Sequence, residues 1–94
     1  YSAAKAAVLG FTRSLAREVV RDAVTVNALC PASVDTPQGR SPPPGYNVEH
    51  FRNQPLGRFA TVDEVAPTAV LLASDAGAYY VGASLNVNGG DVMI

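Results

Sequence analysis

A short β-branched run, directly after a long helical pattern, constrains the fold more than any other feature. Residues 24–29, Val-Thr-Val-Asn-Ala-Leu, are almost wholly apolar, and Pro31 ends the run. A strand buried on both faces has this composition, which is typical of a parallel sheet with helical crossovers. We expect the amide of Asn27 to hydrogen-bond to neighbouring backbone rather than to a substrate. The run therefore predicts an α/β fold.

Two helices and a second strand complete the pattern. A capping box formed by Thr61 and Glu64 opens a helix over 61–74, and alternation over 83–87 predicts a strand. The expected order is helix, strand, long loop, helix, strand. The first helix is predicted over 1–22, because apolar residues recur there at steps of three and four: Ala4, Ala7, Val8, Phe11, Leu15 and Val19.

The loop over 30–60 is long and aperiodic, and it is rich in Pro and Gly at 38–45. In open α/β sheets, ligands bind beyond the carboxyl ends of the strands, so we expect a binding site here. Within the loop, residues 47–53 could form a short helical turn, and His50 is interpreted as a surface histidine rather than a catalyst.

Tyr1 and Lys5 stand four residues apart in the first predicted helix, so both side chains should project from one face. A free phenol titrates near ~10, and an ammonium held beside it favours the phenolate. The pair is therefore a candidate device for proton transfer. The alternative is that an exposed helix carries the two residues at this spacing without any catalytic role.

Charge and composition exclude several classes of function. The net charge is −1 with no basic block, which argues against nucleic acid and anionic membranes as partners. No apolar run approaches the ~20 residues that span a bilayer. The single Cys30 cannot form an intrachain disulfide, and with one histidine we expect no metal site. A reducing, cytoplasmic setting fits this composition.

Six segments in order resemble the C-terminal part of a classical short-chain dehydrogenase/reductase. The resemblance covers essentially all 94 residues and implies a C-terminal fragment of a doubly wound, Rossmann-like parallel sheet. The segments are Tyr-Ser-Ala-Ala-Lys at 1–5 with its helix, 24–28 leading into Pro31, 34–37, 56–59, 71–75 and 81–90.

The resemblance implies a role for each matching residue. Tyr1 would exchange a proton with the oxygen of a small alcohol or carbonyl substrate while hydride moves between the substrate and the nicotinamide of NAD or NADP. Lys5 would lower the pKa of that phenol and hydrogen-bond the nicotinamide ribose. Residues 38–55 would form the variable substrate loop. The cofactor-binding loop residues would be Pro31, Ala32, Val34 and Thr36.

The chain departs from the family pattern at Ala32, where a glycine is usual, and alanine disfavours a positive φ. The family's Gly-rich phosphate-binding turn precedes the tyrosine, and these 94 residues contain no such turn. We therefore expect the N-terminal nucleotide-binding half to be absent and the isolated chain to be inactive.

Self-association is also expected, as a dimer or tetramer through the 1–22 helix and the C-terminal strand. Gly10 with its neighbouring alanines could form a helix–helix contact or could simply be tolerated small residues. The alternative function is a non-catalytic remnant or oligomerisation module that binds no dinucleotide.

Overall fold

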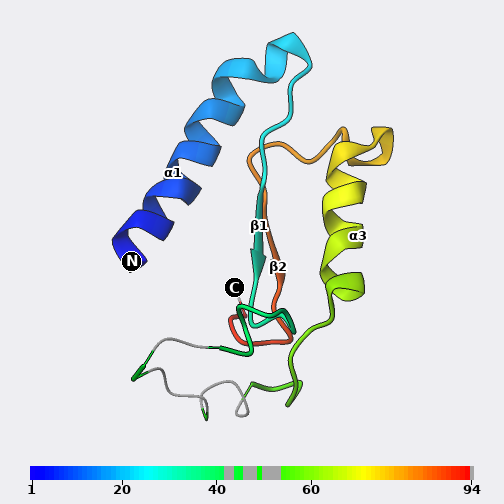
Figure 1. Ribbon diagram of the computed structural model, residues 1–94. Coiled ribbons are helices and arrows are strands. Elements are labelled where there is room, and N and C mark those ends of the chain that lie inside the picture. The colour runs from blue at the N-terminus through cyan, green and yellow to red at the C-terminus, as the bar shows by residue number, and fades with distance from the viewer. Residues whose placement is uncertain (42–43, 46–48, 50–53, 94) are drawn as a thin grey trace. The chain divides into compact units, whose positions relative to one another are not determined.

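The computed structural model describes residues 1–41, 44–45, 49 and 54–93 (Figure 1). The chain divides into two compact units. The first combines Tyr1–Leu29 with Thr68–Leu85, and the second combines Cys30–Pro67 with Asn86–Ile94. The helical turn expected over 47–53 and the histidine at 50 fall outside the described residues, apart from Glu49.

Helix α1 spans Ser2–Val19 and continues into the 3₁₀ helix η1 at Val20–Asp22, where the sequence predicts one helix over 1–22. Its packed face differs from the expected one. Thr12 and Ala16 are buried, with 5% and 1% of their surface exposed, whereas Phe11 is 65% exposed. The reason is that the backbone of Gly82 lies against Ala16: a Cβ built at Gly82 would be 3.5 Å from the Cβ of Ala16.

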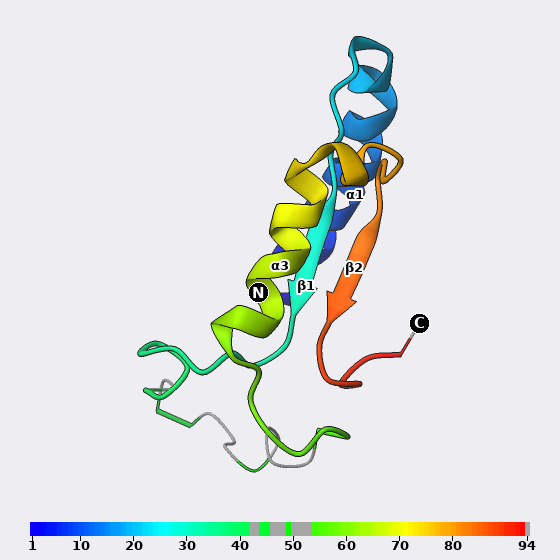
Figure 2. The ribbon, with the colours of Figure 1, turned by 90° about the vertical axis from the view of Figure 1, so that its right-hand side faces the viewer.

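Strands β1 (Ala28–Pro31) and β2 (Ser84–Val87) are neighbours in a two-stranded sheet. Their arrows run in the same direction, so the pair is parallel (Figure 2). The strand predicted at 24–29 begins too early, because β1 starts at Ala28. Pro31, which was expected to end the strand, belongs to it. The expectation that this strand is buried on both faces was also wrong: Ala28, Leu29 and Cys30 are half-buried and Pro31 is exposed. Little of the described chain packs over the sheet, since Ala16 is the single buried apolar side chain in that part.

The residues just before β1 bind the loop that leads into β2. Gly82 N–H donates to the carbonyl of Val26 at 2.8 Å. The amide of Asn27 donates to the carbonyl of Tyr80 at 2.8 Å and accepts from Ala83 N–H at 3.0 Å. The structural role predicted for Asn27 is therefore confirmed. These contacts take the place of regular strand pairing at residues 26–27.

Helix α3 (Val62–Ala73) begins within the predicted capping box and runs through Pro67. The carboxylate of Glu64 accepts from Thr61 N–H at 2.8 Å, as a capping box requires. The Thr61 hydroxyl, however, also lies 3.2 Å from Glu64 Oε2, so it binds the carboxylate. After the helix, Ser74 N–H and Oγ both donate to the carbonyl of Leu71, at 3.1 and 2.8 Å, and the 3₁₀ helix η2 follows at Asp75–Gly77.

The chain buries little apolar surface by itself. Among the described residues, Ala16 is the single buried apolar side chain, and no large side chain is fully enclosed. Val8, Phe11, Val70 and Tyr79 are each more than half exposed. The apolar excess of the sequence thus lies largely at the surface of the described part. No helix within that part is both long enough and apolar enough to cross a bilayer.

Candidate active site

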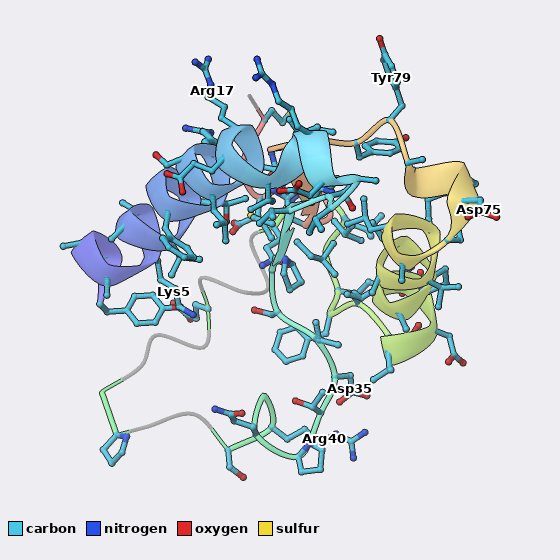
Figure 3. The ribbon with its side chains drawn as sticks, turned by 90° about the horizontal axis from the view of Figure 1, so that it is seen from above. Lys5, Arg17, Asp35, Arg40, Asp75 and Tyr79 are labelled. Carbon is cyan, nitrogen blue, oxygen red and sulfur yellow. The ribbon has the colours of Figure 1, made fainter. Side chains whose placement is uncertain are left out.

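The first turn of α1 brings Tyr1 and Lys5 together. The backbone N–H of Lys5 donates to the carbonyl of Tyr1 at 3.0 Å, which closes one helical turn. Lys5 Nζ lies 5.5 Å from the centroid of the Tyr1 ring, a separation at which an ammonium is attracted to an aromatic face. Figure 3 shows the Lys5 side chain at the N-terminal end of α1. The shared face predicted from the four-residue spacing is present.

Tyr1 is open to an incoming molecule, because 94% of its surface is exposed. Its residue is the N-cap of α1 and makes no side-chain capping hydrogen bond, so the hydroxyl is not used in holding the helix. An exposed phenol beside a cation can exchange a proton with a substrate oxygen. The first turn of the helix therefore places an exposed phenol and an ammonium side by side.

The loop after β1 is held in register by one backbone partner. Ala60 N–H donates to the carbonyl of Ser33 at 3.0 Å, and Asp35 N–H donates to the carbonyl of Ala60 at 2.8 Å. These bonds form a parallel bridge between Val34 and Ala60. Within the second unit, the structure thus brings the predicted positions Val34 and Thr36 into one ordered segment that follows Pro31.

Alanine at position 32 carries no backbone strain. Among the described non-glycine residues, only Ala23 has a positive φ, so Ala32 sits in a conformation open to any L-residue. The replacement of the family's usual glycine is therefore compatible with the loop as it is built here.

A compact turn over 35–41 replaces part of the expected irregular loop. Arg40 Nε and Nη2 donate to the two carboxylate oxygens of Asp35, at 2.5 and 2.9 Å (Figure 3). These hydrogen bonds from Arg40 hold the pKa of Asp35 below its ordinary value. Gly39 N–H donates to Thr36 Oγ1 at 3.1 Å. Sequence reasoning missed the pair, although Thr-Pro-Gln-Gly is a typical turn sequence.

The second unit also contains a small cavity of about 180 Å³. Of the predicted cofactor-binding residues, Ala32 lines it, whereas Lys5, Pro31, Val34 and Thr36 do not. Its lining residues are Ala32, Ser33, Gln54, Leu56, Arg58, Ala60, Glu64, Val87, Asn88 and Gly89. In the described part of the chain, no group of His, Cys, Asp and Glu side chains is arranged to hold a metal ion.

Comparison with known proteins decides the family. A family model described as enoyl-(acyl carrier protein) reductase matches residues 1–91. The 3-oxoacyl-(acyl-carrier-protein) reductase of Pseudomonas aeruginosa is 46% identical over 93 residues, which is 99% of this chain and 38% of that protein. The rat dehydrogenase/reductase SDR family member 6 is 41% identical over 96 residues, covering 96% of this chain and 39% of that protein.

This chain belongs to the short-chain dehydrogenase/reductase family. A solved structure of a Serratia marcescens short-chain dehydrogenase/reductase variant superposes with a TM-score of 0.83 at 32% identity, over 97% of this chain and 37% of that one. The short-chain dehydrogenase/reductase fold is thus present as part of a Rossmann-like α/β domain. The chain spans about 38% of the length of the curated relatives that it matches.

Proposed function

We propose that this chain carries the proton-transfer residues of an NAD(P)-dependent oxidoreductase that acts on a small alcohol or carbonyl substrate. The observation that carries the proposal is the pairing of the exposed Tyr1 ring with the Lys5 ammonium, 5.5 Å from its centroid. Membership of the short-chain dehydrogenase/reductase family supports it. Relatives that are named as reductases also support the proposal. One is the acetoacetyl-CoA reductase of Shinella zoogloeoides, which is 41% identical over 95 residues.

In the direction of reduction, Tyr1 gives its hydroxyl proton to the substrate oxygen, and in oxidation it takes that proton back. The nicotinamide, when bound, supplies or accepts the hydride at the substrate carbon. Lys5 would attract the negative charge that develops on the Tyr1 oxygen, because opposite charges attract, and its ammonium would donate to the hydroxyls of the ribose.

Pro31, Ala32, Val34 and Thr36 would lie along the cofactor. The fit of this loop is supported by the unstrained backbone at Ala32 and by the fixed register of Val34 against Ala60. The choice between NAD and NADP stays open in this proposal. We further propose a cytoplasmic protein whose 94 residues do not catalyse turnover by themselves, since no Gly-rich phosphate-binding turn lies among them.

The test is made in the natural full-length protein with NADH and NADPH. Tyr1→Phe should lower kcat at least about a hundredfold and leave the nucleotide Kd nearly unchanged, because it removes only the hydroxyl. Tyr79→Phe is the matched control, since Tyr79 is 99% exposed in the same unit. Comparable turnover in Tyr1→Phe and Tyr79→Phe would refute the role of Tyr1.

Lys5 is tested separately. Lys5→Ala should weaken nucleotide binding and lower kcat together, because the ammonium serves both the ribose and the phenolate. Arg17→Ala, which removes another exposed cation of α1, should change neither. If Lys5→Ala leaves both quantities unchanged, Lys5 is not part of the site.

The exposed apolar positions on α1 support a homo-oligomer, a dimer or tetramer that also uses the C-terminal strand. Val8 and Phe11 are 55% and 65% exposed, beside Gly10, where a Cβ would meet no atom within 4 Å. Light scattering should give a smaller mass for Phe11→Glu than for Arg17→Glu, which introduces a glutamate at another exposed position of α1. Equal masses would refute this interface.

The same surface favours one alternative function, a non-catalytic association module. The intact mass of the natural protein and a nucleotide titration separate the two. A protein of 9.8 kDa per chain that oligomerises and binds neither NADH nor NADPH supports the module. A heavier chain that binds either nucleotide supports the oxidoreductase.

A further inference from the structure

The cavity of the second unit lies where the two strands of the sheet end. Ala32 and Ser33 follow β1, and Val87 ends β2, so the carboxyl ends of two parallel strands meet at its lining. Ligands of open α/β proteins bind at this edge of the sheet. The volume of the cavity is about 180 Å³. Since a cavity of about 150 Å³ holds benzene, a molecule of about six to eight non-hydrogen atoms fits here.

Backbone hydrogen bonds hold the walls of the cavity together. Leu56 N–H donates to the carbonyl of Gly89 at 3.1 Å, and Ala60 N–H donates to the carbonyl of Ser33 at 3.0 Å. All four residues line the cavity. Gly89 has a φ of 60°, and a Cβ built there would lie 3.2 Å from the Cβ of Leu56. Three segments that are distant in sequence are thus joined around the cavity, as in a preformed site.

Gln54 brings a buried amide group to this lining. The residue is 6% exposed, and its backbone carbonyl accepts from Gly57 N–H at 2.7 Å. Among the residues that the structure describes, none hydrogen-bonds the side chain of Gln54. A buried amide without a partner is unfavourable, because it has lost its hydrogen bonds to water. The Gln54 amide is therefore available to a molecule that enters the cavity.

The charges around the cavity cancel. Arg58 and Glu64 are the two charged residues of the lining, and they bind each other through hydrogen bonds of 2.8 and 2.6 Å. A charged ligand would have to compete with this pair for either group. Much of the remaining lining is apolar and includes Leu56, Ala60 and Val87. The cavity therefore favours a neutral molecule with an apolar body and one polar group.

A carboxamide is the polar group that complements Gln54. The side chain of Gln54 offers an N–H donor and a carbonyl acceptor next to each other, and a second amide offers the same two groups in the opposite order. The two amides can therefore form a pair of N–H···O bonds. We propose that this cavity binds a small neutral carboxamide, whose amide group pairs with the side chain of Gln54. Of the proposed cofactor-binding residues only Ala32 lines the cavity, and the inference goes beyond the proposed function.

The experiment titrates isobutyramide, a carboxamide of this size, into the isotope-labelled natural full-length protein. The NMR signals of the Leu56 and Gly89 backbone amides should shift with a Kd of about 0.1–10 mM, the range of so small a ligand. Saturating NADH or NADPH should leave this Kd unchanged, because the cavity is not the cofactor site. Methyl isopropyl ketone, which has a similar shape but no N–H, should bind about tenfold more weakly.

Three variants locate the bound amide. Gln54→Leu should raise the Kd of isobutyramide about tenfold or more, because the hydrogen-bonding group is lost. Its melting temperature without ligand should not fall, since the replaced amide has no partner to lose. Gln38→Leu, at an exposed glutamine of the same unit, is the matched control and should change neither quantity. Tyr1→Phe should leave the Kd unchanged, whereas it would raise the Kd if isobutyramide bound as an analogue of a carbonyl substrate.

The outcomes separate this inference from the proposed function. Wild-type signals that do not move with isobutyramide refute the site. Equal Kd values for wild type and Gln54→Leu would also refute it, as would a Kd that rises with saturating dinucleotide or in Tyr1→Phe. If Gln54→Leu fails to fold, Ala60→Leu decides instead, because the larger side chain fills the cavity and should abolish binding. A protein that binds isobutyramide through Gln54 but neither dinucleotide would refute the proposed function alone.

Discussion

Arg58 and Glu64 form a two-pronged ion pair at the start of α3, with Nη1 and Nη2 of Arg58 lying 2.8 and 2.6 Å from the two carboxylate oxygens. Glu64 also accepts from Thr61 N–H, so one carboxylate serves both the ion pair and the helix cap. Hydrogen bonds from Arg58, then from the Thr61 backbone, lower the pKa of Glu64 from 4.5 to about 2. These contacts connect the segment at Arg58, before α3, to the first residues of α3.

The lowered pKa of Glu64 predicts a pH window. Because the folded-state pKa is below the ordinary value of 4.5, the contribution of Glu64 to stability is present above that value and is lost as pH falls toward about 2. The unfolding free energies of wild type and Glu64→Gln, measured by denaturant titration, should therefore differ at neutral pH and converge between about pH 4.5 and about pH 2. Glu18→Gln, at an exposed position of α1, is the control. A gap of constant size down to pH 2 would contradict the assignment.

Asn27 should be important for stability. Its side chain bonds the carbonyl of Tyr80 and the N–H of Ala83, so Asn27→Ala leaves two backbone groups without these partners. We expect a loss of about 1–3 kcal/mol in unfolding free energy. Asn86→Ala is the matched control, because Asn86 is exposed on β2 and makes no such bond. An equal effect of both substitutions, measured by thermal denaturation, would show that the bridge contributes nothing.

Ala23 is strained, and glycine should relieve it. The residue follows η1 with φ 60° and ψ 27°, the left-handed conformation that L-residues avoid. Glycine removes the cost of the left-handed conformation but has a greater conformational entropy in the unfolded chain, which offsets part of the gain. Ala23→Gly should therefore stabilise the protein by about 0.5–1 kcal/mol. Ala78→Gly is the control with the opposite sign, since Ala78 has φ −59°. Chemical denaturation that places both variants below wild type would refute the strain.

Two glycines should respond in opposite ways to the same substitution. A Cβ at Gly77 would clash with the carbonyl oxygen of Leu71 and lie 2.8 Å from Leu72 Cα, so Gly77→Ala should destabilise by about 1–3 kcal/mol. At Gly10 nothing lies within 4 Å, and Gly10→Ala should stabilise α1 by about 0.5–1 kcal/mol. Thermal denaturation of both variants checks the pair. A destabilising Gly10→Ala would mean that another backbone packs against that position.

The positions of both helices and of β2 follow from local sequence. Helical periodicity, the Thr61–Glu64 capping box and the alternation over 83–87 each act within a few residues, and α1, α3 and β2 lie within one or two residues of the predicted ranges once η1 is joined to α1. The proximity of Tyr1 and Lys5 is of the same kind, because one helical turn places residues four apart on one face.

Tertiary structure decided the start of β1, the partners of Asn27 and the packed face of α1. Asn27 finds Tyr80 across 53 positions of sequence, and Ala16 is buried because Gly82 approaches it. Such contacts depend on where distant segments meet, which periodicity does not encode. The sequence by itself thus determined the elements, the family resemblance and the Tyr1–Lys5 pair. Only the folded chain decided which side chains those elements bury and which distant backbone groups Asn27 binds, because long-range packing and hydrogen bonding override local preference.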